Sequence, residues 1–307
     1  GVPAAYLEDE ISMLEEKGLI TRLKGEKYQT SIIIFNKKMN EHIDSIFKRY
    51  APVIASKLFE ELSVKQLEVR KIGFYGFDFS WGKLMWCLLQ AVMTLPIADS
   101  LHFGSLAKLP LLKQGNHGWV WGSENTIMPW DWGISNKAIT KSSGRDDKYA
   151  VLIDFPFLGT DNQRLIDTEK LLLLCKLKDG GLKVTTLNER EREIAANLAE
   201  NGYATIRDGV LKSEVGILTF DQGEELKAVW KAAYELYLEC IRNVQEEITK
   251  VMIAEVPKHL HDQLGPIGYV KTISGMISAI IEELVEKDYI KVPEGIQKNP
   301  MGCYIRV

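Results

Sequence analysis

The sequence lacks the patterns from which most catalytic and metal sites are recognised. Its four cysteines (Cys87, Cys175, Cys240 and Cys303) are scattered, and no two have the spacing of a zinc site or a redox pair. The motifs GxGxxG, HExxH and GxSxG are absent. The Gly-Lys pair in residues 77–84 lacks both the first glycine of a P-loop and the Ser or Thr after the lysine. We therefore expect no enzyme activity, no cofactor and no metal.

Long apolar runs and an excess of positive charge are missing too. The most apolar stretch, residues 84–98, contains Gln90 and Thr94 and is shorter than the ~20 apolar residues that span a bilayer. Residues 1–20 lack the basic start and apolar run of a signal peptide. A net charge of −4 excludes a uniformly basic nucleic-acid binder but allows a local basic patch. These features predict a cytoplasmic protein with reduced thiols and no membrane contact.

What the sequence does contain is typical of a globular protein with more than one domain. Its 307 residues are 46% hydrophobic and 26% charged, which is enough apolar material for real cores. A chain of this length fits two or three domains of ~100–200 residues each.

The opening segment predicts a helix followed by a hairpin. Pro3 is tolerated in a first helical turn, and Leu7, Ile11 and Leu14 recur at spacings of four and three, as on one face of a helix. Gly18 is a typical helix stop. Residues 19–35 then predict two short strands around a turn at residues 24–26.

This order resembles the recognition helix and wing of a bacterial winged helix-turn-helix transcription regulator. Residues 1–11 look like the turn and the start of the recognition helix, residues 14–20 like its end, and residues 21–35 like the wing. The helices that precede the turn in that family are absent, as in a trimmed chain. The resemblance implies DNA binding, with phosphate contacts by Arg22, Lys24 and Lys27, and with Tyr6 near base edges.

The charge of the first helix favours a different use. Residues 1–20 hold five carboxylates and a single lysine, Lys17, and phosphates on both sides of a major groove would repel them. The segment that follows is basic, so the wing remains able to contact DNA. Contact with a protein partner through the acidic helix is the alternative.

The helix-and-hairpin pattern recurs twice further along the chain. Residues 14–35 align with residues 198–220 and 284–307, with helix stops at Gly18, Gly202 and Asp288 and turn glycines at Gly25, Gly209 and Gly295. We therefore expect both ends of the chain to share one fold. Long amphipathic helices are predicted at 39–62, where Pro52 should kink or split the helix, and at 223–256. The apolar stripe of the second helix either packs within its own domain or pairs two subunits in a homodimer.

The middle of the sequence predicts a mixed α/β domain. Residues 149–159 are typical of a buried strand, and residues 171–184 of two strands joined at 179–181. Four tryptophans lie within fourteen residues: Trp119, Trp121, Trp130 and Trp132. Such a cluster either forms a compact β core or offers an aromatic surface to a ligand or partner.

The sequence therefore predicts an α+β protein with winged-helix-like modules at both ends. The expected divisions are 1–62 (partial winged helix and long helix), 63–186 (central Trp-rich domain) and 187–307 (winged-helix-like modules with a long helix). The expected function is a regulator that binds DNA or the transcription machinery, with a central domain that senses a signal or binds a partner. The alternative is a non-catalytic interaction scaffold whose winged helices have lost DNA contact.

Overall fold

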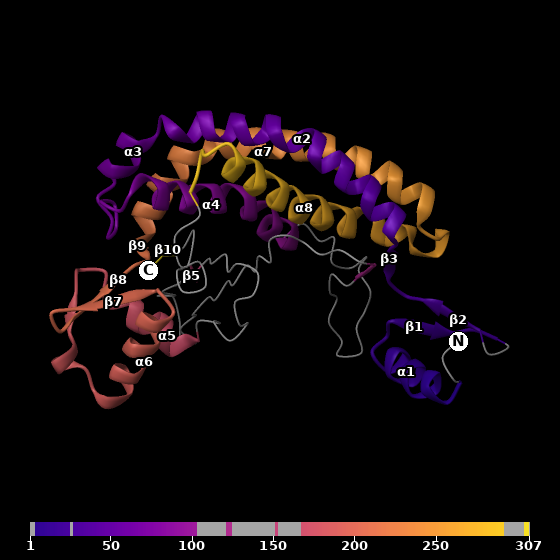
Figure 1. The fold of residues 1–307 in the computed structure, drawn as a ribbon, viewed down its shortest axis with the longest axis horizontal. Coiled ribbons are helices and arrows are strands. Elements are labelled where there is room, and N and C mark those ends of the chain that lie inside the picture. Colours follow the sequence, from indigo (N-terminus) through magenta and orange to yellow (C-terminus); the bar gives the residue numbers. More distant parts are fainter. Residues whose placement is uncertain are drawn as a thin grey trace. The chain divides into compact units, whose positions relative to one another are not determined.

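The computed structural model describes residues 4–24, 27–102, 121–124, 151–152, 167–291 and 304–306. Helices and short strands alternate along these residues, which confirms the α+β class (Figure 1). The elements are α1 (Ala4–Glu16), β1 (Ile20–Arg22), β2 (Tyr28–Thr30), β3 (Ile33–Phe35), α2 (Lys37–Ser63), α3 (Gln66–Lys71), α4 (Trp81–His102), β4 (Trp121–Ser123), β5 (Val151–Leu152), α5 (Thr168–Cys175), β6 (Leu182–Lys183), η3 (Val184–Thr186), α6 (Glu189–Glu200), β7 (Ala204–Arg207), β8 (Val210–Ser213), β9 (Gly216–Leu218), α7 (Phe220–Glu255), η4 (Lys258–Gln263), α8 (Leu264–Glu286) and β10 (Tyr304–Arg306).

The chain forms two compact units, each built from separate segments. Unit 1 contains Gly1–Val53, Leu95–Ile127 and Leu238–Ile280, and unit 2 contains Ile54–Thr94, Met128–Tyr237 and Ile281–Val307. The helices α2, α4, α7 and α8 each have residues in both units. The three-domain division expected from the sequence stays a prediction, because nearly half of its central segment lies outside the described residues.

The long helices bury the apolar stripes that the sequence predicts. On α7, Leu226, Trp230, Ala233, Tyr237, Val244, Ile248 and Val251 are all buried, and Cys240 is half-buried. This burial favours packing within the chain over the homodimer alternative, because the stripe is already covered. The helix α2 continues through Pro52 without being split.

The segment Lys258–Glu286 is long and apolar enough, by length and composition, to cross a membrane. However, 72% of its most apolar window is buried inside the chain. A core helix of a folded protein has the same composition, so this helix is weak evidence for a membrane span.

The element order of the first half of the chain recurs in the second half. We call residues 4–123 the first repeat and residues 189–306 the second. Each has a helix, an antiparallel hairpin, a third strand and a long helix, then a second apolar helix and a returning strand. The returning strand pairs in parallel with the third strand in both repeats: β4 with β3, and β10 with β9.

From the third strand onward, the two repeats also agree residue by residue. Strand β9 begins 183 residues after β3 (216 against 33), and β10 begins 183 residues after β4 (304 against 121). At the same offset, Asn36 accepts a hydrogen bond from the Met39 amide (2.8 Å) and Thr219 accepts one from the Gln222 amide (3.3 Å). The sequence matches at this offset as well, with identical residues at Lys108 and Lys291, Pro110 and Pro293, Gln114 and Gln297, and Asn116 and Asn299. The repetition is therefore present in both backbone and sequence.

The predicted similarity of the two chain ends is correct for the helix stop and wrong for the hairpin. Gly18, Gly202 and Asp288 all have positive φ (73°, 78° and 54°), and each follows a helix. The next amide donates to a carbonyl five residues back in every case: Leu19 to Leu14, Tyr203 to Leu198, and Tyr289 to Leu284, each at 2.9 Å. A hairpin follows Gly18 and Gly202. After Asp288, the described part of the chain instead supplies β10, whose partners are β9 and the antiparallel β5.

Residues 171–184 do not form the two strands expected from the sequence. Residues 168–175 form the helix α5, and β6 follows the turn. Asp167 begins the helix by accepting a hydrogen bond from the Lys170 amide at 2.8 Å. Leu171 and Leu174 are buried three residues apart, which is helical spacing that a run of leucines conceals. The strand expected at 149–159 is confirmed at Val151–Leu152, and its other residues lie outside the described residues.

Candidate functional site

The first candidate surface is the α1–β1–β2 segment, which we call the first head. The helix α1 lies beside the hairpin (Figure 1), and β1 pairs with β2 in the register Ile20–Thr30 to Arg22–Tyr28. Two hydrogen bonds attach the hairpin to η4: Gln263 donates to the Ser31 carbonyl (2.8 Å), and a His259 ring nitrogen lies 3.0 Å from the Thr30 carbonyl. The hairpin therefore has a fixed base in unit 1.

The three wing cations expected from the sequence are all on this hairpin. Arg22, Lys24 and Lys27 are exposed, and the Arg22 guanidinium lies 5.8 Å from the centre of the Tyr28 ring. Among the described residues none of the three forms an ion pair, so their charges are available to an anionic partner. Tyr6 lies on α1, but its side chain is outside what the structure describes.

The tryptophan cluster is described at one position. Trp121 is half-buried on β4, opposite Ile33 of β3, where it contributes to the strand pairing of unit 1. Trp119, Trp130 and Trp132 lie outside the described residues. The choice between a β core and a partner surface therefore stays a prediction.

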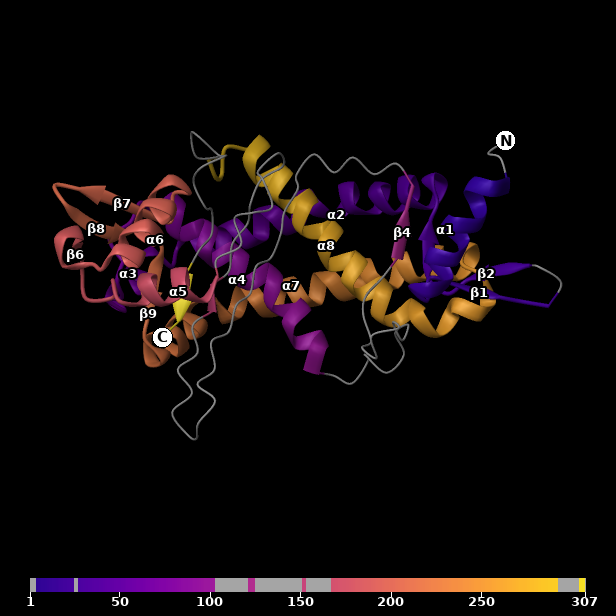
Figure 2. The same ribbon diagram turned by 90° about the horizontal axis from the view of Figure 1, so that it is seen from below.

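A second helix-and-wing segment, α5–β6–α6–β7–β8, lies in unit 2, and we call it the second head. Its sheet has the order β6–β8–β7, and Figure 2 shows α6 alongside it. The turn between β7 and β8 is the pair Asp208-Gly209, both with positive φ (52° and 71°), as a two-residue hairpin turn requires. Leu171, Leu174, Leu198 and Leu211 pack into one buried cluster beneath these elements.

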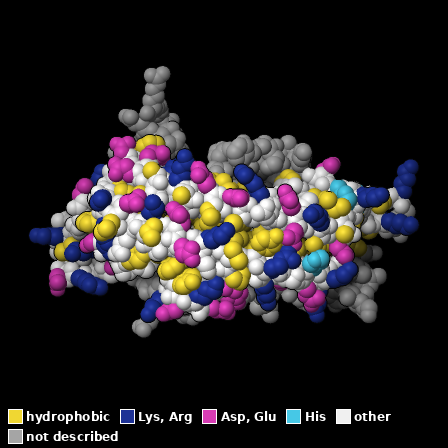
Figure 3. All heavy atoms as spheres, turned by 90° about the horizontal axis from the view of Figure 1, so that it is seen from above, with side chains coloured by type: hydrophobic (Ala, Val, Ile, Leu, Met, Phe, Trp, Pro, Cys, Tyr) yellow, Lys and Arg dark blue, Asp and Glu magenta, His cyan; other side chains and the backbone are white. Residues whose placement is uncertain are grey.

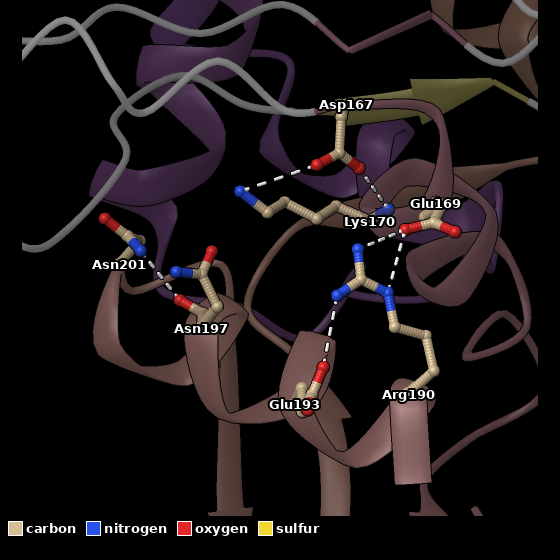
Figure 4. A network of polar contacts seen from close by, with 7 residues as sticks. All are labelled: Asp167, Glu169, Lys170, Arg190, Glu193, Asn197 and Asn201. Carbon is tan, nitrogen blue, oxygen red and sulfur yellow. Dashed lines mark hydrogen bonds and ion pairs between the residues drawn. The ribbon is translucent and has the colours of Figure 1, made fainter. Parts of the chain in front are cut away.

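The exposed side of α6 holds a network of ion pairs rather than free cations (Figure 4). Arg190 contacts Glu169 of α5 at 2.7 Å and Glu193 of its own helix at 3.1 Å. Both carboxylates raise the pKa of Arg190, Glu169 more than Glu193. Glu191 accepts a hydrogen bond from Lys176 at 2.6 Å, which together with the Asn188 amide lowers the pKa of that carboxyl.

The second arginine of α6 is also engaged, since Arg192 donates to the Leu187 carbonyl at 2.9 Å. The helix carries four glutamates against these two arginines. Like α1, it therefore presents mainly negative charge, which phosphates would repel.

The cations of the second head lie on its strands instead. Lys183 of β6, Arg207 of β7 and Lys212 of β8 are all exposed. Both heads therefore combine an acidic helix with a basic hairpin. Elsewhere the charge is mixed: over the face drawn in Figure 3, Lys and Arg side chains are interspersed with Asp and Glu, without a broad field of one sign.

Comparison of the chain with protein-family models, curated proteins and solved structures found no match.

Sequence reasoning found the first head and the hairpin of the second, but it missed three features. It did not identify α5 and β6 as parts of the second head. It did not identify Arg207 and Lys212 as cations of the second wing, although both flank the Asp-Gly turn. It also missed the matches 183 residues apart, which would have identified the returning strands.

Proposed function

We propose that this protein is a regulator that binds duplex DNA through the wings of two winged-helix-like heads present in one chain. The observation that carries the proposal is the repetition of one arrangement, an acidic helix followed by a hairpin with exposed cations. Proteins that recognise two half-sites commonly obtain two copies of a reading head by dimerisation. A duplicated chain supplies both copies by itself.

Because the helices are acidic, the helix and the wing of each head have different roles in this proposal. The wings neutralise phosphates, and this sequence-independent contact supplies most of the affinity for duplex DNA. The carboxylates of α1 and α6 are more compatible with a basic protein surface, such as a component of the transcription machinery. A non-catalytic interaction scaffold is the second candidate function, and these helices favour it.

Salt-dependent binding to duplex DNA tests the first candidate. The chain should bind a pool of random-sequence duplexes at low salt, and the logarithm of its affinity should fall linearly with the logarithm of salt concentration. Alanine at Arg22, Lys24 and Lys27 together should weaken binding and flatten the slope by about 2.7, since each phosphate contact contributes about 0.9.

A control variant replaces three exposed lysines outside both wings, Lys57, Lys227 and Lys250, with alanine. It removes the same net charge and should leave the slope near the wild-type value. Failure of the wild-type chain to bind any duplex at low salt would overturn DNA binding and leave the scaffold as the better proposal.

A further inference from the structure

A cavity of about 740 Å³ lies within unit 2, bordering the second head. Three segments line it: the start of α4, the residues from the end of α6 to Glu214, and the residues that follow α8. Phe59 of α2 completes the lining. Small-molecule sites in proteins are typically clefts of ~300–1,000 Å³, so this volume suits a ligand larger than a single amino acid.

Aromatic side chains form much of the wall, and they are held in place. Trp86 is only 2% exposed, and its indole N–H donates to the Lys291 carbonyl at 3.1 Å. Phe59 and Tyr289 stack with ring centres 4.2 Å apart and planes 8° apart. With Trp81, the half-buried rings of Phe59 and Tyr289 give the cavity an aromatic lining.

The charged groups of the lining fall into two classes. Lys83 and Glu214 are 3.0 Å apart and neutralise one another, and Glu214 also lies 3.2 Å from the Thr205 hydroxyl. Arg207, Lys291 and Asp288 are exposed at the rim, and none of them forms an ion pair with any described residue. The cavity therefore offers two free positive groups and one free negative group beside an aromatic wall.

We propose that this cavity binds a zwitterionic molecule with an aromatic body, about the size of a dipeptide. The ligand carboxylate pairs with Arg207 and Lys291, its ammonium group pairs with Asp288, and its ring packs against Trp81 and Tyr289. A ligand with only a carboxylate would leave Asp288 without a partner, and a ligand with only an ammonium group would leave Arg207 and Lys291 without one. Because the lining includes β7 and the start of α4, the ligand stabilises the contact between the second head and α4.

The test uses a matched set of probes and needs no DNA, so its result is independent of the proposed function. Isothermal titration calorimetry would compare phenylalanyl-phenylalanine with its N-acetyl form, which lacks the ammonium group, and its C-terminal amide, which lacks the carboxylate. We expect the dipeptide to bind with a dissociation constant below about 1 mM and each blocked form to bind about tenfold more weakly.

Two variants test which cavity residues pair with the carboxylate and the ammonium group of the dipeptide. Arg207→Gln combined with Lys291→Gln should weaken dipeptide binding about tenfold and remove the difference between the dipeptide and its amide. Asp288→Asn should do the same for the N-acetyl form. Asparagine tolerates the positive φ of 54° at this position, so the backbone is preserved. The control Lys212→Gln changes an exposed cation of the same head that does not line the cavity.

A third variant fills the cavity. A Cβ at Gly82, which lines the cavity, would meet no atom within 4 Å, so Gly82→Leu should fold with unchanged thermal stability and bind the dipeptide less tightly. The proposal is overturned if the dipeptide does not bind below about 1 mM, or if the blocked forms bind as tightly as the dipeptide. Equal loss of affinity in Lys212→Gln would overturn the assignment of the rim charges.

Discussion

The two units contain the same pair of parallel strands but stabilise its surroundings with different chemistry. In unit 1, the amide nitrogen of the buried Asn40 donates to the Phe35 carbonyl (3.0 Å), the Ser123 hydroxyl (2.9 Å) and the Glu124 carbonyl (3.2 Å). Its oxygen lies 3.4 Å from the ammonium group of Lys271, which is 9% exposed and lies 5.0 Å from the centre of the Phe35 ring.

In unit 2, the residues at the same offset are Gly223 and Leu88. Leu88 is 2% exposed and packs beside Leu84 and Leu218, so the strand pair β9–β10 has an apolar neighbour in place of an amide and an ammonium group. One backbone arrangement is thus compatible with a polar or an apolar environment. The polar version depends on every hydrogen bond being made, because an unpaired buried polar group is costly.

The largest effect on stability is expected at a position where α8 has a glycine and the corresponding helix, α4, has a larger side chain. Gly275 of α8 corresponds to Val92 of α4, and a Cβ at Gly275 would lie 2.0 Å from the ring of Phe47. Phe47 is buried and has little room to move. Gly275→Val, which would make the two repeats alike, should lower the free energy of unfolding by about 3 kcal/mol in urea denaturation.

The matched control for that variant is Gly265→Ala, on the same helix, where an added Cβ meets no atom within 4 Å. It should be neutral or slightly stabilising. Adding Phe47→Leu to Gly275→Val should restore part of the loss, and the absence of any coupling in this double-mutant cycle would contradict the predicted steric overlap.

The next largest effect tests the polar network of unit 1. Asn40→Ala removes the partner of three acceptors and of Lys271, and we expect a loss of about 2 kcal/mol in the free energy of unfolding. The double variant combines Asn40→Ala with Lys271→Leu, which introduces the residue type found at the equivalent position of unit 2. Its loss in the free energy of unfolding should be smaller than the sum of the losses in the two single variants. Strict additivity would mean that Asn40 and Lys271 do not interact.

A smaller effect on stability tests how the two heads differ at the start of their helices, α1 and α6. In the second head the Asn188 side chain begins α6 by accepting a hydrogen bond from the Glu191 amide at 2.8 Å, and the Glu191 carboxylate accepts one from the Asn188 amide. Residues 3–5, which precede or begin α1, are proline and alanine, whose side chains accept no hydrogen bond. Asn188→Ala should cost about 1 kcal/mol. Asn188→Asp should retain nearly all of the stability, and an equal loss in both variants would argue against capping.

The smallest effect is a pH dependence confined to unit 1. Burial lowers the pKa of Lys271 from its ordinary value of 10.5, and the carboxylate of Asp44 only partly offsets this. The folded chain therefore releases this proton at a lower pH than the unfolded chain, and stability rises with pH between the lowered pKa and 10.5. The free energy of unfolding of the wild type should rise relative to Lys271→Met between pH 8 and about 10.

The control for the pH series is Leu88→Met, at the equivalent position of unit 2, where no titratable group is gained or lost. Its difference from the wild type should be constant over the same range. If the Lys271→Met difference is constant as well, Lys271 does not titrate differently in the folded and unfolded chain.

Features that depend on neighbouring residues could be predicted from the sequence. The helix stops at Gly18, Gly202 and Asp288 have the expected positive φ, because glycine and aspartate adopt this conformation at the lowest cost. The stripe of α7 is buried as its spacing predicts, and the Asp208-Gly209 turn joins β7 to β8. The exposed cations of the first wing were also identified, because hairpin turns project into solvent.

Features that join distant segments required the tertiary structure. The run Leu171–Leu174 suits either a strand or a helix by itself, and the packing of α5 on the second head selects the helix. Strand β10 pairs with β9, whose residues lie 88 positions earlier in the chain, and a local pattern gives no signal for such a parallel pairing. The cavity is likewise lined by Phe59, Trp86, Arg207 and Asp288, whose chemistry becomes complementary only when four separate segments meet. Side-chain spacing determines local conformation, whereas the burial and partners of a distant residue follow from how the whole chain packs.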